Sequence, residues 1–244
     1  MKKIVLFCFL QSFFIGIIFP SDVVHLNYRL KLGFVTAGKA DFYLGDSVLQ
    51  NKKLKYTKVV AQTTSIAKSI FPVNDKLASY YNPNTALPAM ATYDISEGNK
   101  KYYNKVLFDQ EKRRASATLK DTTFALKQST FDVLSALYFL NHHDLDQFKI
   151  GQVTKIPILH NNSFFVMQVK YMGIETMEID GRKYRCHKFS PSNDPNSKVE
   201  QKTTVWISDD KNKIPVCIYF ELPIVNLKLE LLNTKNLRYP LAVK

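Results

Sequence analysis

The chain has 244 residues, of which 45% are apolar and 23% charged, as expected of one large globular domain with a sizeable core. Its formal net charge is +13, yet only six of the 34 basic residues are arginine, and the lysines are scattered along alternating segments. Nucleic-acid binders cluster arginine for contacts to phosphates and bases, so we expect no nucleic-acid partner. Diffuse positive charge suffices for a peripheral contact with an anionic membrane surface.

The N-terminal segment has the pattern of a secretory signal peptide. Lysines at positions 2 and 3 precede an apolar run of 16 residues, IVLFCFLQSFFIGIIF, and Pro-Ser-Asp follows it. The run is somewhat short for a bilayer span. We therefore expect a signal peptide over residues 1–21 and one exported β-rich domain over residues 22–244, periplasmic or extracellular. The sequence leaves the cleavage site near Ser21 open.

Alternating apolar and polar residues predict strands in the first half of the mature chain. In residues 25–33, HLNYRLKLG, the apolar side chains fall on one face and the polar ones on the other. Similar patterns predict further strands over residues 36–44, 53–64, 65–71, 101–109 and 114–126. The proline-bearing residues 80–90 are predicted to form a loop or an edge segment, because proline cannot donate to a ladder.

One helix is predicted in the middle of the chain. Apolar residues at helical spacing cover nearly the whole circumference of a helix over about residues 129–142, which predicts that this helix is buried. Ser129 can cap its start, and Asp132, three residues later, fits a capping box. A single buried helix among many strands is expected to lie inside or across a curved sheet.

The second half of the chain is again predicted to be β. Strands are predicted over residues 163–173, 174–179, 182–189, 203–208, 214–222 and 225–233. Asp180-Gly181 is the strongest hairpin signal in the chain. The predicted fold class is mainly β, with a single large antiparallel curved sheet or an incomplete β-barrel and one buried helix.

The residue types that carry catalysis or bind metals form no recognisable motif. The run His142–Asp146, HHDLD, follows the helix, but neighbouring residues there point in different directions, so a polar helix end is the simpler interpretation. Nucleophile elbows and glycine-rich phosphate loops are missing. We expect a non-enzymatic protein with no catalytic, cofactor-binding or metal-binding residues. Polar side chains converging in a pocket, with Asp209, Asp210 or His143 among them, would point to an enzyme instead.

A polar stretch between two strand patterns, Ser208–Asn212 (SDDKN), resembles the first half of a calcium loop. Asp210 and Asn212 have the D-x-N spacing, but the following glycine and the final glutamate of such a loop are missing. Asp and Asn between two apolar runs are typical of a hairpin connection. We therefore predict a turn at this position and no calcium site.

The mature chain keeps two cysteines, Cys186 and Cys217. Export permits a disulfide between them. A meander would place the strand around Trp206 between the two cysteines, however, and strands about 4.8 Å apart keep such cysteines out of bonding range. Cys186 and the adjacent His187 point to opposite faces of one strand, so they form no local pair. The sequence leaves the pairing of the cysteines open.

Three stretches of the chain carry the motifs of a known family. They are Asp132–Tyr138 (DVLSALY), Gly173 and Glu175 with the later run Cys186–Pro191, and Trp206–Pro215 (WISDDKNKIP). In these motifs the chain resembles the bacterial exported proteins of domain-of-unknown-function family 3108. The resemblance implies an exported, mainly antiparallel β protein with no assigned activity, similar in general look to periplasmic lipoprotein carriers. Asn141–Asp144 departs from the family's usual arginine-containing exit from the helix.

Two hypotheses of different classes follow for the function. The first is a binding module, in which the concave side of the sheet holds an acyl chain or other apolar ligand. The side chains expected to line that ligand site, or to fill the core in its place, are Leu134, Leu137, Tyr138 and Trp206. The alternative is a structural or protein-interaction component of the cell envelope, which would bind a partner through strand edges or charge. Ligand, partner and oligomeric state stay open.

Overall fold

The computed structural model describes residues 23–192, 203–221 and 225–243. The predicted signal peptide over residues 1–21 lies outside the described residues. Within the three described ranges, no helix combines the length and the apolar character that a membrane crossing requires.

The strands of the described residues belong to one antiparallel sheet. They are β1 (Val24–Leu32), β2 (Val35–Leu49), β3 (Lys52–Thr63), β4 (Asn74–Tyr81), β5 (Pro88–Glu97), β6 (Lys100–Asp109), β7 (Arg114–Ala117), β8 (Thr122–Ala125), β9 (Val153–His160), β10 (Ser163–Ile179), β11 (Arg182–Ser192), β12 (Thr203–Ser208), β13 (Pro215–Phe220) and β14 (Leu227–Lys235). The helical segments are α1 (Ser65–Ile70), the 3₁₀ turns η1 (Leu119–Asp121) and η2 (Leu145–Gln147), and α2 (Val133–Asn141).

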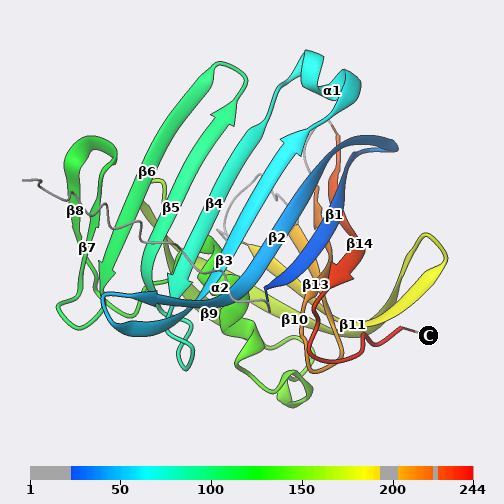
Figure 1. The fold of residues 1–244 in the computed structure, drawn as a ribbon. Helices are drawn as coiled ribbons and strands as arrows, with labels where there is room; N and C mark the ends of the chain where they lie inside the picture. Colours follow the sequence, from blue (N-terminus) through cyan, green and yellow to red (C-terminus); the bar gives the residue numbers. More distant parts are fainter. Residues whose placement is uncertain (1–22, 193–202, 222–224, 244) are drawn as a thin grey trace, which may run out of the picture.

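The order of the strands in the sheet is two meanders joined in the middle. Strands β8 to β1 follow one another in reverse chain order, and β14 to β9 continue on the other side of β1. The pairing of β1 with β14 therefore brings the first and last strands of the described residues together near the centre of the sheet. Figure 1 shows the sheet curling around α2. The predicted fold class, a single curved antiparallel sheet with one buried helix, is confirmed.

The two edge strands of the sheet, β8 and β9, are not paired with each other, and other contacts connect the two edges. Phe131 fills part of the open edge of β9, because its N–H donates to Pro157 O at 2.9 Å and its carbonyl accepts from Leu159 N at 2.9 Å. The rings of Phe124 on β8 and Phe164 on β10 pack edge to face, with centroids 5.7 Å apart. The sheet thus stays open between β8 and β9, and the gap is spanned by the contact of Phe124 with Phe164 and by the bridge from Phe131, which follows β8 in the chain.

The N-cap of helix α2 lies three residues later than the predicted cap Ser129. The N-cap is Asp132, whose side chain accepts from the backbone N–H groups of Leu134 and Ser135, and Ser135 completes the capping box. The predicted box of Ser129 and Asp132 is wrong because Phe131 is still extended in its bridge to β9. The helix itself is buried as predicted, and it packs against β4 and β9.

Several predicted strand bounds are corrected by the structure. Most of the segment predicted as a strand over residues 65–71 is helix α1, which ends at Ile70, because the β2–β3 ladder ends at Thr63. Residues 114–126 form two short strands interrupted by η1. Of the predicted loop over residues 80–90, only 82–87 lies between strands, and Pro88 opens β5 at a point where the register with β4 shifts.

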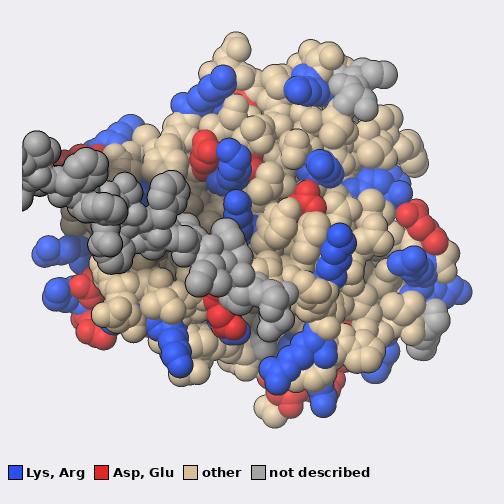
Figure 2. All heavy atoms as spheres, viewed as in Figure 1, with Lys and Arg blue, Asp and Glu red and all other residues tan. Residues whose placement is uncertain are grey.

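The sheet presents different side chains on its two faces. Tyr171, His187, Phe189 and Ile207 face inward, toward α2 and η2. Cys186, Trp206 and Cys217 form a separate cluster on the opposite face. Both cysteines are free thiols, with β12 between their strands, and burial raises the pKa of each to about 12. On the face drawn in Figure 2, basic and acidic side chains are interspersed.

Candidate functional site

A cavity of about 830 Å³ lies beside α2. Its walls come from α2, the β2–β3 hairpin, the β4–β5 loop, the β12–β13 turn and the segment that follows β14. The lining residues are Val24, Leu44, Gly45, Asp46, Lys55, Tyr81, Pro83, Tyr138, His142, Lys211, Asn212, Ile214, Asn236, Leu237, Arg238 and Tyr239. The elements that meet here are distant in the sequence and are brought together by the curl of the sheet.

The apolar wall of this cavity is built around two stacked tyrosines. The ring centroids of Tyr81 and Tyr138 are 5.3 Å apart, with 21° between the ring planes. Burial raises the pKa of Tyr138 well above its usual value, so its hydroxyl remains neutral. That hydroxyl is buried next to Thr57, whose own hydroxyl lies 3.3 Å from the hydroxyl of Tyr81. The two rings therefore present an apolar surface to the cavity, while the Tyr138 hydroxyl points into the protein interior.

The rim of the cavity is mainly cationic. Lys211 and Arg238 both lie over the ring of Tyr239, each 5.5 Å from its centroid. Lys55 also lines the cavity and pairs with the exposed Asp46 at 2.5 Å. Burial lowers the pKa of His142, and the neighbouring His143 and Lys213 lower it further. The cavity therefore combines an apolar wall with a positively charged opening.

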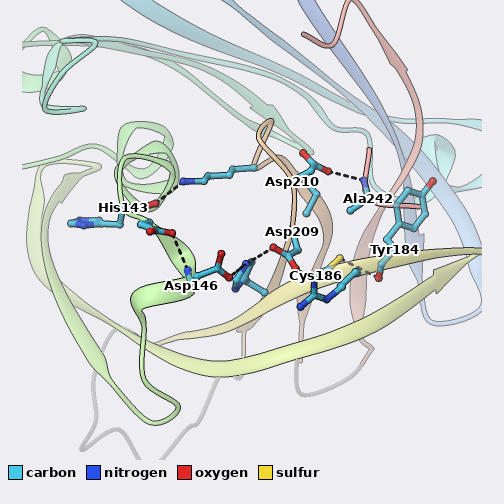
Figure 3. A network of polar contacts seen from close by, with 12 residues as sticks. His143, Asp146, Tyr184, Cys186, Asp209, Asp210 and Ala242 are labelled. Carbon is cyan, nitrogen blue, oxygen red and sulfur yellow. Dashed lines mark hydrogen bonds and ion pairs between the residues drawn. The ribbon is translucent and has the colours of Figure 1, made fainter. Parts of the chain in front are cut away.

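The predicted hairpin turn holds one wall of the cavity in place. Asp210 accepts a hydrogen bond from Ala242 N at 2.9 Å, as Figure 3 shows. Asn212 donates to Tyr239 O at 2.9 Å and accepts from Tyr239 N at 3.1 Å. The turn between β12 and β13 is confirmed, and its polar side chains fasten the C-terminal segment that carries Arg238 and Tyr239.

A second cluster of polar side chains lies at a smaller cavity of about 250 Å³ between η2 and the same turn. His187 Nε2 is 3.0 Å from Asp209 Oδ1 and 3.9 Å from Asp146 Oδ1. The lining also includes Asp210. Polar side chains thus converge in a pocket with Asp209 and Asp210 among them, which is the arrangement that the sequence singles out as a mark of an enzyme.

Comparison with known proteins identifies the family. The family model "Protein of unknown function (DUF3108)" matches residues 27–231. The chain belongs to the DUF3108 family. No curated protein matches it. Among solved structures, it is similar to the crystal structure of a beta-barrel-like protein of Domain of Unknown Function DUF1849 from Brucella abortus, with 8% identity and a TM-score of 0.57 over 87% of this chain and 96% of that one. At this identity the likeness concerns the fold alone.

The four side chains predicted to line a ligand site or core are separated in this DUF3108 member. Leu134 and Leu137 pack in the core between α2 and the sheet. Tyr138 lines the large cavity. Trp206 lies in the cluster on the other face of the sheet, where its indole N–H donates to Glu175. The cavity therefore receives one of the four side chains, and the other three occupy core positions.

Other residues of the two cavities have no local signal in the sequence. Lys55 lies in an ordinary strand pattern and Arg238 in a polar segment, and the two are 183 residues apart in the sequence. Asp146, His187 and Asp209 come from η2, β11 and the end of β12. The family motif that ends in Trp206–Pro215 does mark the turn to which both cavities are attached, and it is the part of the sequence that could have pointed to them.

Proposed function

We propose that this DUF3108 protein is an exported binding protein of the cell envelope that holds a lipid or other anionic amphiphile. We also propose that it is non-enzymatic, with the polar side chains around His187 in the smaller cavity serving to bind an ion and not to carry out catalysis. The main support for this proposal is the cavity of about 830 Å³ with an apolar wall and a cationic rim. Small-molecule sites in proteins typically occupy about 300–1,000 Å³ and are mostly apolar with a few placed polar groups. The apolar chain of the ligand would lie against Tyr81 and Tyr138, and its anionic group near Lys211 and Arg238.

The proposal extends to the surroundings in which the protein acts. The signal-peptide pattern of residues 1–21 supports export to the periplasm or beyond. The net charge is +13, and basic side chains are interspersed with acidic ones on the face drawn in Figure 2. Such diffuse positive charge supports a peripheral contact with anionic membrane surfaces and no nucleic-acid partner. Such a contact would bring the cavity close to a source of amphiphiles.

Ligand binding is tested with two probes of equal chain length, oleate and oleyl alcohol. Native mass spectrometry of the purified protein and displacement of a fluorescent fatty acid give occupancy and affinity. We expect oleate to bind more tightly than the alcohol and to raise the melting temperature with concentration. If neither probe binds and no lipid is extracted from the purified protein, the proposal is wrong.

Variants assign the binding to this cavity. Arg238→Gln should weaken oleate binding by about fivefold, as for a partly exposed ion pair, and leave oleyl alcohol unchanged. Arg114→Gln removes another exposed arginine, on β7 and outside the cavity lining, and should change neither affinity. Leu44→Trp places a larger side chain in the apolar wall and should abolish binding of both probes.

The alternative function, a structural or interaction component of the envelope, is supported by apolar side chains exposed on β10. Phe164, Val166, Met172 and Ile174 are each at least 40% exposed. Crosslinking in intact cells distinguishes the two functions, because an interaction component should be recovered in a complex whether or not its cavity has been blocked by Leu44→Trp.

A further inference from the structure

We propose that Asp146, His187 and Asp209 form a binding site for a divalent metal ion, with zinc as the ion that fits best. The site lies in the smaller cavity between η2 and the β12–β13 turn, and it is independent of the proposed amphiphile binding. Each of the three residues offers one ligand atom, and these atoms all lie within 4.8 Å of one another.

The distances are close to those that zinc requires. Zinc binds imidazole nitrogen and carboxylate oxygen at about 2.0–2.2 Å in tetrahedral geometry, so its ligand atoms stand roughly 3.4 Å apart. His187 Nε2 is 3.0 Å from Asp209 Oδ1 and 3.9 Å from Asp146 Oδ1. The Asp146 side chain is 74% exposed on a 3₁₀ turn, so a rotation can bring it to bonding distance without disturbing the core. Figure 3 shows Asp146 and Asp209 pointing toward the same small space.

The imidazole of His187 is already oriented as a metal ligand. The side chain is 2% exposed, and Nδ1 lies 2.9 Å from the hydroxyl of Tyr171. Metal-binding histidines usually donate their second ring N–H to a neighbouring acceptor, which fixes the tautomer. Here Nδ1–H would donate to the Tyr171 oxygen and leave the Nε2 lone pair for the ion. Without metal, His187 Nε2 and Asp209 Oδ1 are joined by a hydrogen bond of 3.0 Å. The ion would take the place of the proton in that hydrogen bond.

Asp209 has a second partner that would steady it as a ligand. Its Oδ2 is 2.7 Å from Arg185 Nη1 in an ion pair, and no well-aligned hydrogen bond to that buried oxygen is found among the described residues. Oδ1 therefore remains directed at His187 while Oδ2 is held by the guanidinium. Such outer contacts to ligating carboxylates are the usual support of metal sites.

The charges around the cavity are compatible with a cation. Asp144 and Asp210 line it together with the two ligating aspartates. Lys211 and Lys213 line it as well, but their ammonium groups are engaged elsewhere: Lys213 donates to His143 O at 2.7 Å, and Lys211 lies over the Tyr239 ring. One nitrogen and two oxygen donors favour zinc over calcium or magnesium, which prefer oxygen alone.

The test is calorimetric titration of the untagged full chain, freed of metal with a chelator, with zinc chloride. We expect one zinc ion per chain with a dissociation constant of micromolar or below. Asp146→Asn keeps the size of an exposed side chain and should weaken binding by at least about tenfold. Asp144→Asn removes a charge from the same cavity without removing a ligand and should stay within about threefold.

X-ray absorption at the zinc edge then identifies the donors. We expect nitrogen and oxygen donors only. Sulfur donors would assign the zinc to cysteine and overturn the proposal, and so would the absence of saturable binding. Equal weakening by Asp146→Asn and Asp144→Asn would show diffuse attraction by the acidic cavity in place of ligation. Calcium or magnesium binding as tightly as zinc would overturn the assignment of the ion.

Discussion

Asp132 is a buried carboxylate at the start of α2, and both of its oxygens accept hydrogen bonds. Oδ1 accepts from Leu134 N and Ser135 N, and Oδ2 accepts from Ser79 Oγ at 2.5 Å. Asp132→Ala removes the cap and leaves the buried Ser79 hydroxyl unpaired. We expect it to lower the free energy of unfolding by about 2–4 kcal/mol, measured by urea denaturation followed by circular dichroism.

The control for this prediction is Ser129→Ala. Ser129 is the cap that the sequence predicts, but it is exposed and lies outside the helix. Its removal should change the free energy of unfolding by no more than about 0.5 kcal/mol. A larger loss for Ser129→Ala than for Asp132→Ala would show that the helix begins where the sequence places it.

Single residues show both what the sequence can and cannot predict. Residue type and spacing are enough to predict a buried helix over about residues 129–142, but they do not separate Tyr138, which lines the large cavity, from Leu134, Leu137 and Trp206, which do not. The cap is misplaced by three residues because the bridge between Phe131 and β9 leaves no local signal. His187 has no partner in its own strand, and its neighbours Tyr171 and Asp209 come from β10 and from the turn after β12, so their cluster appears only once the fold is known.

The turn between β12 and β13 contributes lining residues to both cavities. Asp210 accepts hydrogen bonds from Asn212 through Oδ1 and from Ala242 N through Oδ2. Asp210→Asn puts an amide donor in place of one acceptor, so one of these contacts is lost. We expect a decrease of about 1 kcal/mol in the free energy of unfolding and faster hydrogen exchange at the amides of Ala242 and Arg185, since Arg185 N donates to Ala242 O.

The matched control is Asp180→Asn, the same substitution in the β10–β11 turn. Asp180 has a positive φ of 49° that asparagine tolerates, and its exposed ion pair with Arg29 contributes little. Exchange at Ala242 should be unchanged in this variant. If Asp180→Asn loosens the C-terminal segment as much as Asp210→Asn does, the turn does not fasten that segment specifically.

At the level of elements, alternation identifies strands well where one face is polar and exposed. Residues 25–33 and 36–44 correspond to β1 and β2 for this reason. Strands β4, β5 and β9 are not predicted, and of these β5 and β9 carry proline, which argues against a central strand. Pro157 is tolerated because β9 is an edge of the sheet, and Pro88 because it is the first residue of its strand.

The molecule as a whole is held in its curled shape by contacts between segments that are far apart in the sequence. A curved sheet or incomplete barrel can be predicted from many short strands and one buried helix. The pairing of β1 with β14 cannot, because no local pattern records which distant strands are neighbours. The contact between the β9–β10 turn and β6 is made by Asn161 and Asn162, which accept hydrogen bonds from Tyr102 and Asn104. In the sequence these two asparagines are recognisable only as turn residues.

Asn162 in the β9–β10 turn joins the two ends of the sheet. Its side chain accepts from Asn104 Nδ2 at 3.3 Å and donates to Leu119 O at 2.9 Å. Asn162→Gly removes both contacts, while glycine accepts the residue's φ of 59° without strain. Asn51→Gly makes the same change in the β2–β3 turn, where φ is 62° and the side chain is exposed, so it measures the cost of glycine alone. We expect Asn162→Gly to lower the free energy of unfolding by about 1–2 kcal/mol more than Asn51→Gly, as a shift of one cooperative urea transition. An unchanged midpoint with faster exchange confined to the turn would show that the closure adds nothing to the stability of the whole sheet.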